Sequence, residues 1–175
     1  MRRYGRLPEN IVLLIDYDIL IDSSVLNNDF SEKLGQIVKK YTGCSIVADV
    51  IRHETLNGAY LVTKINCVGY AYQLHILASG SLEVPIVEYN LLMLLRDYIR
   101  ENLADTQLYM DIEKDLEKLH IISNVQRRKK SVKGLYSRYK KLSGVKTTNN
   151  LLKYMDMDKA RKYFNYMTMF FTHIV

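Results

Sequence analysis

Hydrophobic and polar residues alternate through much of the first half of the chain, and this pattern predicts strands. Residues 10–22 begin with the apolar run IVLLI and then alternate. Three further segments, 44–53, 59–68 and 70–79, are rich in β-branched and aromatic residues. Asn57-Gly58 is a dipeptide typical of a tight hairpin turn between the first two of these segments. The pattern therefore predicts an antiparallel β-meander.

Apolar residues recur every three or four positions elsewhere, which predicts helices. One helix is expected from Phe30 to Gly43, because Asp29 and Glu32 have the spacing of a capping box and Gly43 is a typical stop. Four more are expected in the second half of the chain, from Pro85 to about 99, at 105–122, at 125–142 and from Asp156 to about 167.

These elements predict an α+β fold, with a small antiparallel β-meander in the N-terminal half packed against a helical C-terminal half. We expect a single domain over 1–175, with a soft internal boundary near residue 104 between a strand-rich part, 10–104, and a basic helical part, 105–175. The segment 163–175 is rich in Met and aromatic residues, so it is expected in the core, with self-association or membrane contact as alternatives. The β-branched and aromatic residues of its end, 167–175, favour a terminal strand.

The composition is that of a folded chain, with 48% hydrophobic residues and two prolines among 175 residues. No apolar segment reaches the roughly 20 residues that a transmembrane helix needs. The basic start is followed by too short an apolar run for a secretory signal. We therefore expect an intracellular protein, in the cytoplasm or nucleus. Cys44 and Cys67 are expected to be separate buried thiols; the alternative is that they are cross-strand neighbours, which a reducing compartment would keep unbonded.

The positive charge is concentrated in one region of the chain. The net charge is +6, but residues 1–100 carry 10 Lys or Arg against 11 Asp or Glu, whereas residues 101–175 carry 15 against 8. Residues 125–146 contain nine cations and no acidic residue. This asymmetry suggests an anionic partner.

On a helical wheel, 125–142 has an apolar side and a cationic side. The apolar side contains Val125, Val132, Leu135, Tyr136, Tyr139 and Leu142. The candidate nucleic-acid-binding residues are Arg127, Arg128, Lys129, Lys130, Lys133, Arg138, Lys140 and Lys141. Arg128 is the one cation on the apolar side, from which its long stem could reach water. Gly134 could break the helix, since glycine costs about 1 kcal/mol there relative to alanine.

A cationic face of a single sign is unusual for a merely solvated helix, because like charges repel and opposite pairs stabilise. A bound polyanion removes this repulsion and releases counterions, so we expect largely non-specific binding of DNA or RNA through phosphates. The two tyrosines on the apolar side look like packing groups and not like platforms for stacking bases.

Two other classes of function remain open. The first is a small self-associating viral structural protein, matrix-like, that bridges nucleoprotein and an anionic membrane. The second is a Mg²⁺-dependent nuclease or nucleotidyltransferase that uses Asp16 and Asp18, joined by Asp49 on a neighbouring strand. No nucleotide-binding loop, nucleophile elbow or metal-ligand spacing occurs in the sequence, so a non-enzymatic protein without a cofactor is expected.

Overall fold

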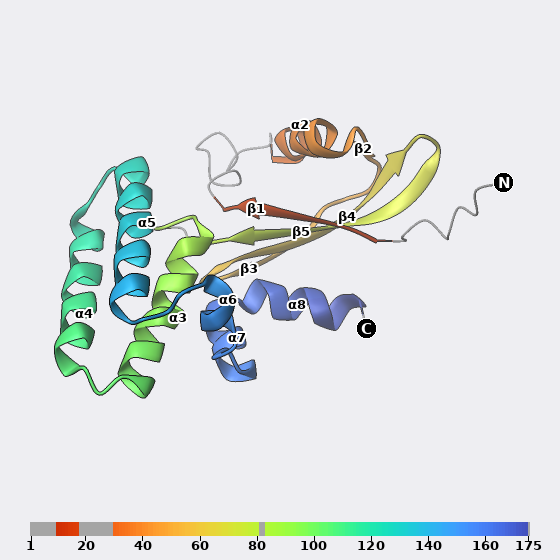
Figure 1. The fold of residues 1–175 in the computed structure, drawn as a ribbon. Helices are drawn as coiled ribbons and strands as arrows, with labels where there is room; N and C mark the ends of the chain where they lie inside the picture. Colours follow the sequence, from red (N-terminus) through yellow and green to blue (C-terminus); the bar gives the residue numbers. More distant parts are fainter. Residues whose placement is uncertain (1–9, 18–29, 81–82, 175) are drawn as a thin grey trace.

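The computed structural model of the chain describes residues 10–17, 30–80 and 83–174 (Figure 1). The strands of its one sheet are β1 (Asn10–Asp16), β2 (Ser45–Ile46), β3 (Ile51–Thr55), β4 (Gly58–Cys67) and β5 (Tyr70–Ser79). The helices are α2 (Phe30–Thr42), α3 (Val87–Asn102), α4 (Thr106–Ile121), α5 (Val125–Leu142), α6 (Thr148–Leu152), α7 (Met157–Tyr163) and α8 (Asn165–Ile174). The predicted α+β fold is confirmed, with the sheet in the N-terminal half and a helical C-terminal half.

The sheet is mixed, in the order β1-β5-β4-β2, and β3 continues the outer edge beside β4. β3, β4 and β5 form the predicted antiparallel meander. β1 instead pairs with β5 in parallel, so the prediction of antiparallel strands throughout is wrong for β1. Alternation along a strand decides which face a side chain occupies, but it carries no information on the direction of the neighbouring strand.

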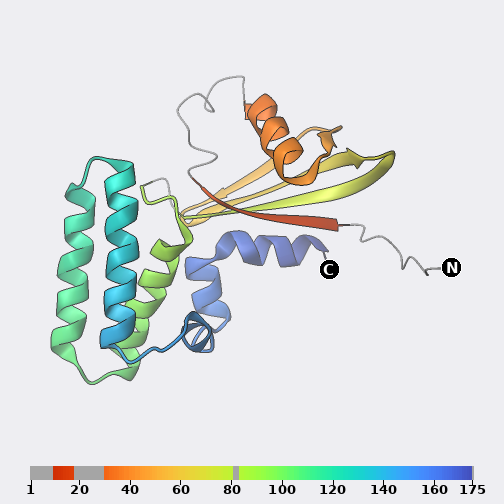
Figure 2. The same ribbon diagram turned by 45° about the horizontal axis from the view of Figure 1, so that its top comes forward.

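Helices cover both faces of the sheet, with α2 on one face and α8 on the other (Figure 2). On the α2 face, Leu34 and Val38 pack against Leu61 of β4 and Ile76 of β5. On the α8 face, the neighbouring residues of the same strands join the core formed by the helices. Residues at alternate positions of each strand therefore serve two separate cores.

α3, α4 and α5 lie side by side at one end of the molecule and pack through apolar residues (Figure 1). The core between them contains Leu92, Leu95, Ile99, Leu108, Ile112, Leu116, Val132, Tyr136 and Tyr139. These residues recur at the spacing of three and four that predicted the helices. α3 begins a few residues after β5, so it connects the sheet to this group of three helices.

The C-terminal segment is helical and not a strand. The single last helix that was expected is two helices, α7 and α8, which meet at Phe164. Tyr166 and Phe170, four residues apart in α8, are both buried, and Phe170 lies against the rings of Tyr60 and His75. The prediction of a terminal strand is wrong because this i,i+4 spacing lets one face of a helix fill the core, which outweighs β-propensity.

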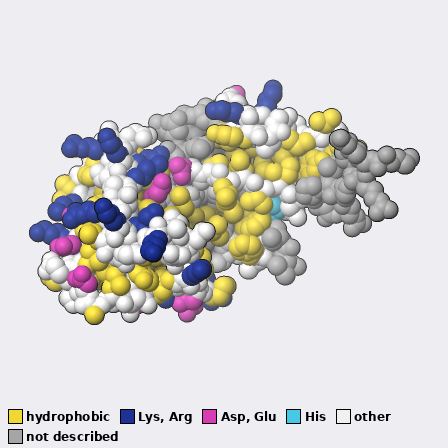
Figure 3. Space-filling view, in the orientation of Figure 1, with side chains coloured by type: hydrophobic (Ala, Val, Ile, Leu, Met, Phe, Trp, Pro, Cys, Tyr) yellow, Lys and Arg dark blue, Asp and Glu magenta, His cyan; other side chains and the backbone are white. Residues whose placement is uncertain are grey.

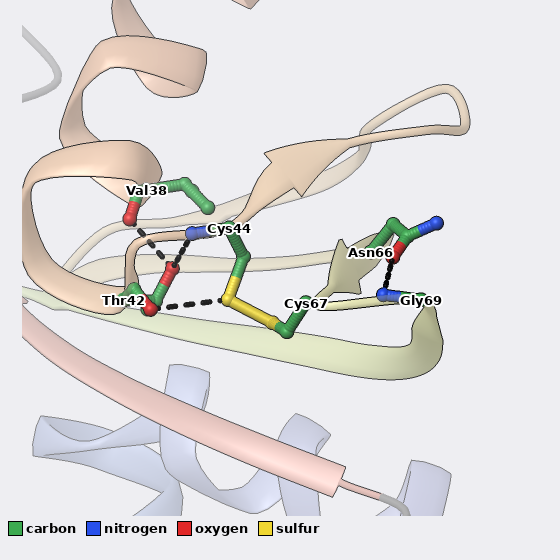
Figure 4. The surroundings of a disulfide bond; sticks show 6 residues. All are labelled: Val38, Thr42, Cys44, Asn66, Cys67 and Gly69. Atoms are coloured by element: carbon green, nitrogen blue, oxygen red, sulfur yellow. Dashed lines mark hydrogen bonds between the residues drawn. A yellow bond between two sulfur atoms is a disulfide. The ribbon is translucent and has the colours of Figure 1, made fainter.

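A disulfide joins Cys44 to Cys67, which are 23 residues apart in sequence (Figure 4). It ties the chain just after α2 to the end of β4, where Thr42 Oγ1 also accepts a hydrogen bond from the Cys44 amide at 3.2 Å. The prediction of two separate reduced thiols is wrong: Cys44 immediately precedes β2 and Cys67 ends β4, and these two strands are adjacent in the sheet. Disulfides persist mainly in oxidising compartments, so the predicted intracellular location loses the support of the cysteines and stays a prediction.

Two tight turns connect the meander. β3 and β4 are joined by Leu56 and Asn57, one residue earlier than the predicted Asn57-Gly58 turn. Gly58 is then required by packing, because a Cβ atom there would lie 2.3 Å from the carbonyl oxygen of Ala78. β4 and β5 are joined by Val68 and Gly69, which both have positive φ, as in a type I′ turn.

Candidate nucleic-acid interface

The basic segment forms one uninterrupted helix, α5, held by its apolar side against α3 and α4. Val132, Tyr136 and Tyr139 are buried, as the helical wheel predicts. Asn124 caps the N-terminus, where its Oδ1 accepts a hydrogen bond from the Arg127 amide at 2.9 Å. The possible break at Gly134 does not occur: the helix runs through it, and a Cβ atom there would meet nothing within 4 Å.

Five exposed residues of α5 recur at intervals of three and four and form one line along its outer side. We call this line the exposed ridge of α5; it consists of Arg127, Lys130, Gly134, Ser137 and Lys141. At 1.5 Å per residue it is about 21 Å long. Figure 3 shows Lys and Arg side chains gathered over this helical end of the molecule. The ridge is therefore a narrow cationic surface whose central residue has no side chain.

The N-terminal turn of α5 is cationic although the helix dipole disfavours cations there. The first turn contains no acidic residue; Arg127 belongs to it and Lys130 to the next turn. The positive end of the dipole and these side chains act in the same direction, so the local field attracts anions. This arrangement lowers the stability of an isolated helix and suits a bound phosphate.

On the α4 side of the ridge, an acidic residue neutralises part of the charge. Asp115 accepts hydrogen bonds from Lys118 at 2.7 Å, from the Tyr139 hydroxyl at 2.8 Å and from Arg138 at 3.2 Å. Burial alone would raise the pKa of Asp115, but the hydrogen bonds from Lys118 and Tyr139 outweigh it and lower that pKa. Burial and the same carboxylate raise the pKa of Tyr139. Arg138 is therefore bound by a permanent carboxylate at neutral pH.

On the α3 side, the cations are also engaged. Lys133 Nζ lies 3.5 Å from Glu88 Oε1 of α3, and Lys140 Nζ lies 5.5 Å from the centre of the Tyr136 ring. Lys129 is half-buried. These three residues flank the ridge, and Lys133 is more than half exposed, so its weak ion pair can exchange for a phosphate.

Arg128 holds the fold together and is not part of the exposed ridge. Its guanidinium donates to the carbonyl oxygen of Ile122 at 2.6 and 2.8 Å and to that of Glu83 at 2.7 Å. Ile122 caps the C-terminus of α4, so Arg128 satisfies a carbonyl that the helix leaves unpaired. The structure thus turns this predicted binding residue inward, as its position on the apolar side of the wheel allowed.

Two residues of the ridge were not among the predicted binding residues. Gly134 and Ser137 fall on the cationic side of the same wheel, between Lys130 and Lys141. A hydroxyl group donates readily to phosphate oxygens, and a glycine lets a phosphate backbone approach the helix closely. The signal that could have identified them is their angle on the wheel, which depends on position and not on charge.

The acidic residues proposed for a metal site are not brought together. Asp16 ends β1 and Asp49 follows β2, so β5 and β4 lie between them. Asp18 lies outside the described residues. Within the described ranges, no group of three or more His, Cys, Asp or Glu is placed to hold a metal ion. The joint site of Asp16 and Asp49 is therefore excluded by the strand order.

The side chains that the structure describes in the C-terminal segment, up to residue 172, offer little apolar surface for membrane contact. Tyr163, Phe164 and Phe170 are buried in the core, and Phe171 is 58% exposed. Among the helices of the described part, none is long and apolar enough to cross a membrane. A matrix-like protein would need an exposed apolar strip for membrane insertion, and most aromatic residues of this segment are buried instead. The cations that could contact an anionic membrane remain exposed on α5.

Comparisons with known proteins give no relative from which a role could be transferred. No family model matches the chain, and no curated protein or solved structure is significantly similar to it. A functional conclusion therefore depends on the site alone.

Proposed function

We propose that the protein binds DNA or RNA without sequence preference, through phosphate contacts along the exposed ridge of α5. The observation that carries the proposal is the ridge itself: Arg127, Lys130 and Lys141 lie on one exposed line, in a segment of nine cations and no acidic residue. Phosphate contacts hold a protein on a nucleic acid but do not read its sequence. We regard the protein as a binding protein and not as an enzyme.

The number of phosphates bound at once is smaller than eight cations would suggest. Arg128 is bound to backbone carbonyl groups, and the hydrogen-bonded ion pair of Arg138 with Asp115 competes with phosphate for that arginine. The three ridge cations remain, and Lys133 and Lys140 can join them from the flank. We therefore expect about three to five simultaneous phosphate contacts.

Replacing the three ridge cations with glutamine tests the proposal. The variant Arg127→Gln/Lys130→Gln/Lys141→Gln should bind labelled duplex DNA and structured RNA much more weakly at low salt. Each phosphate contact contributes to affinity through counterion release, so the weakening should be similar for all sequences. Fluorescence anisotropy titrations measure it, and thermal unfolding checks that the fold survives.

A matched control separates the ridge from net charge. Lys39, Lys40 and Lys64 are exposed cations of α2 and β4, away from α5 (Figure 1). Replacing these three with glutamine changes the net charge by the same amount and should leave binding nearly unchanged. Equal weakening by both triple variants would show that only the overall charge attracts nucleic acid. Absence of binding at low salt would refute the function itself.

A further inference from the structure

The two edges of the sheet differ in how they are protected from pairing with another strand. The outer edge beside β4 is short, is interrupted between β2 and β3, and carries the ion pair of Arg52 and Glu54. Short, broken and charged edges resist pairing with another chain. β1 forms the other edge with seven residues, NIVLLID, and its interior contains no charge, proline or interruption. It is the edge without these protective features.

The main chain of β1 presents hydrogen-bonding groups on its outer side. Tyr17 donates its amide to the carbonyl of Ser79 in β5, and Ile15 uses its carbonyl to accept from the Ser79 hydroxyl. Because successive residues of a strand alternate in direction, Leu13 and Ile15 face β5, whereas Val12 and Leu14 turn their amide and carbonyl groups outward. No strand of the described ranges lies on that side of β1.

The side chains at the same two positions form an uncovered apolar surface. Val12 is 45% exposed and Leu14 is 66% exposed, on the face of the sheet that α8 covers. α8 packs on β3, β4 and β5, and beside Leu14 it leaves a hollow of about 610 Å³. The hollow lies at the edge of the sheet. Its apolar lining comes from Leu13, Ile15 and Tyr41 on the α2 side and from Leu77, Val87, Tyr166 and Met167 on the α8 side. Figure 3 shows hydrophobic side chains gathered over the sheet on this side of the molecule.

We propose that two copies of the chain pair through β1, edge to edge and antiparallel, to form one continuous sheet across the dimer. With the two-fold axis at Leu13, Val12 lies opposite Leu14 of the partner subunit, so the exposed apolar side chains cover one another. Asn10 then lies opposite Asp16 of the partner subunit, an amide beside a carboxylate. The outward groups of four such pairs supply about eight main-chain hydrogen bonds.

Charge favours antiparallel over parallel pairing of two copies. β1 begins at the neutral Asn10 and ends at the acidic Asp16. Antiparallel pairing places Asp16 beside Asn10 of the partner subunit, whereas parallel pairing in register would place it beside Asp16 of the partner subunit, and like charges directly opposite are destabilising. A two-fold contact uses the same edge of both copies, so association closes at the dimer.

Charged variants test both the interface and its register. Val12→Glu and Leu14→Lys should each shift the protein to monomer, as measured by sedimentation velocity over about a hundredfold range of concentration. The double variant Val12→Glu/Leu14→Lys should restore the dimer, because each glutamate then faces a lysine. Val47→Glu is the matched control: Val47 is 55% exposed at the opposite edge, and its replacement should leave the dimer intact.

Amide hydrogen exchange provides a test in the unmodified protein, which also serves if a variant fails to fold. The amides of Val12 and Leu14 should become protected as concentration rises, whereas those of Leu13 and Ile15 should be protected at every concentration. A protein that stays monomeric throughout, oligomers larger than dimers, or a dimer unaffected by Val12→Glu and Leu14→Lys would each overturn the proposal.

The dimer does not depend on nucleic acid. All of these measurements are made without it, and the variant lacking the cations of the exposed ridge should still form dimers. Conversely, Leu14→Lys should retain the α5 helix and its phosphate contacts. Failure of one proposal can therefore be distinguished from failure of the other.

Discussion

At the scale of single residues, neighbouring cations of α5 have different roles. Arg127 belongs to the exposed ridge, whereas the guanidinium of Arg128 is bound to the carbonyl oxygens of Ile122 and Glu83. The two residues are adjacent in sequence and identical in type, so they form a natural pair for substitution.

Arg128→Gln should lower the free energy of unfolding by about 1.5–3 kcal/mol, because hydrogen bonds that involve a charged group contribute about that much and the partly buried carbonyl of Ile122 loses its donors. Its effect on nucleic-acid affinity should be small. Arg127→Gln should do the reverse, with little change in stability and weaker binding. Chemical denaturation and anisotropy titrations of both variants test this, and an unchanged stability of Arg128→Gln would contradict the structural role.

The sequence was sufficient to assign sides to the residues of α5, but not to assign their partners. The wheel placed Arg128 on the apolar side because that position depends only on the helical period. Glu88, Asp115 and the carbonyl of Ile122 belong to other elements, and their approach to α5 depends on how α3 and α4 pack. For this reason the sequence predicted more free cations than the structure provides.

At the scale of elements, a buried charge cluster joins α3 to α7. Asp97 of α3 is 2% exposed and accepts hydrogen bonds from Lys162 at 2.9 Å, from Arg96 at 3.0 Å and from the Tyr163 hydroxyl. Burial alone would raise the pKa of Asp97, but the hydrogen bonds from Tyr163, Lys162 and Arg96 outweigh it and lower the pKa.

Asp97→Asn should lower the free energy of unfolding at neutral pH by about 1.5–3 kcal/mol, because the buried carboxylate loses its charged hydrogen bonds to Arg96 and Lys162. The lowered pKa also gives the sign of the pH dependence. The contribution of Asp97 is complete above its unfolded pKa, near 4, and is lost as the pH falls through the lower folded pKa. Acid should therefore destabilise the native protein more than the Asn variant. Denaturation from pH 7 to pH 2 checks this, and parallel stability curves would contradict it.

A second link between elements is the disulfide that ties the end of α2 to β4. Cleaving it with reductant should lower the free energy of unfolding by about 3 kcal/mol, because the bond closes a loop of about 24 residues in the unfolded chain. The variant Cys44→Ala/Cys67→Ala should be insensitive to reductant, which makes it the control. Equal stability of the native protein with and without reductant would show that the bond does not contribute.

Element types were more predictable than their pairing. The apolar period predicted α2, α3, α4 and α5, and alternation predicted the meander, because both follow from local geometry. Three features depend on contacts between distant segments and were not predicted. They are the parallel direction of β1, the bond between Cys44 and Cys67, and the helical form of the C-terminal segment. The last case shows the competition directly, since Tyr166 and Phe170 fill the core from a helix although their neighbours favour strand.

At the scale of the whole molecule, the two proposed surfaces are on different elements. The exposed ridge belongs to the helical end, and the open edge β1 belongs to the sheet (Figure 1). The sequence anticipated the first through its concentration of charge. It did not indicate the second, because an apolar run such as IVLLI is equally typical of a buried strand.

The dependence of nucleic-acid affinity on salt tests the central claim most directly. For duplex DNA, three to five phosphate contacts predict a slope of log K against log salt concentration of about −3 to −4.5. The variant without the cations of the exposed ridge should have a slope smaller in magnitude by about 0.9 for each phosphate that it no longer neutralises, whereas the Lys39/Lys40/Lys64 variant should keep the native slope. A native slope near zero, or the same slope in the ridge variant, would contradict phosphate binding by α5.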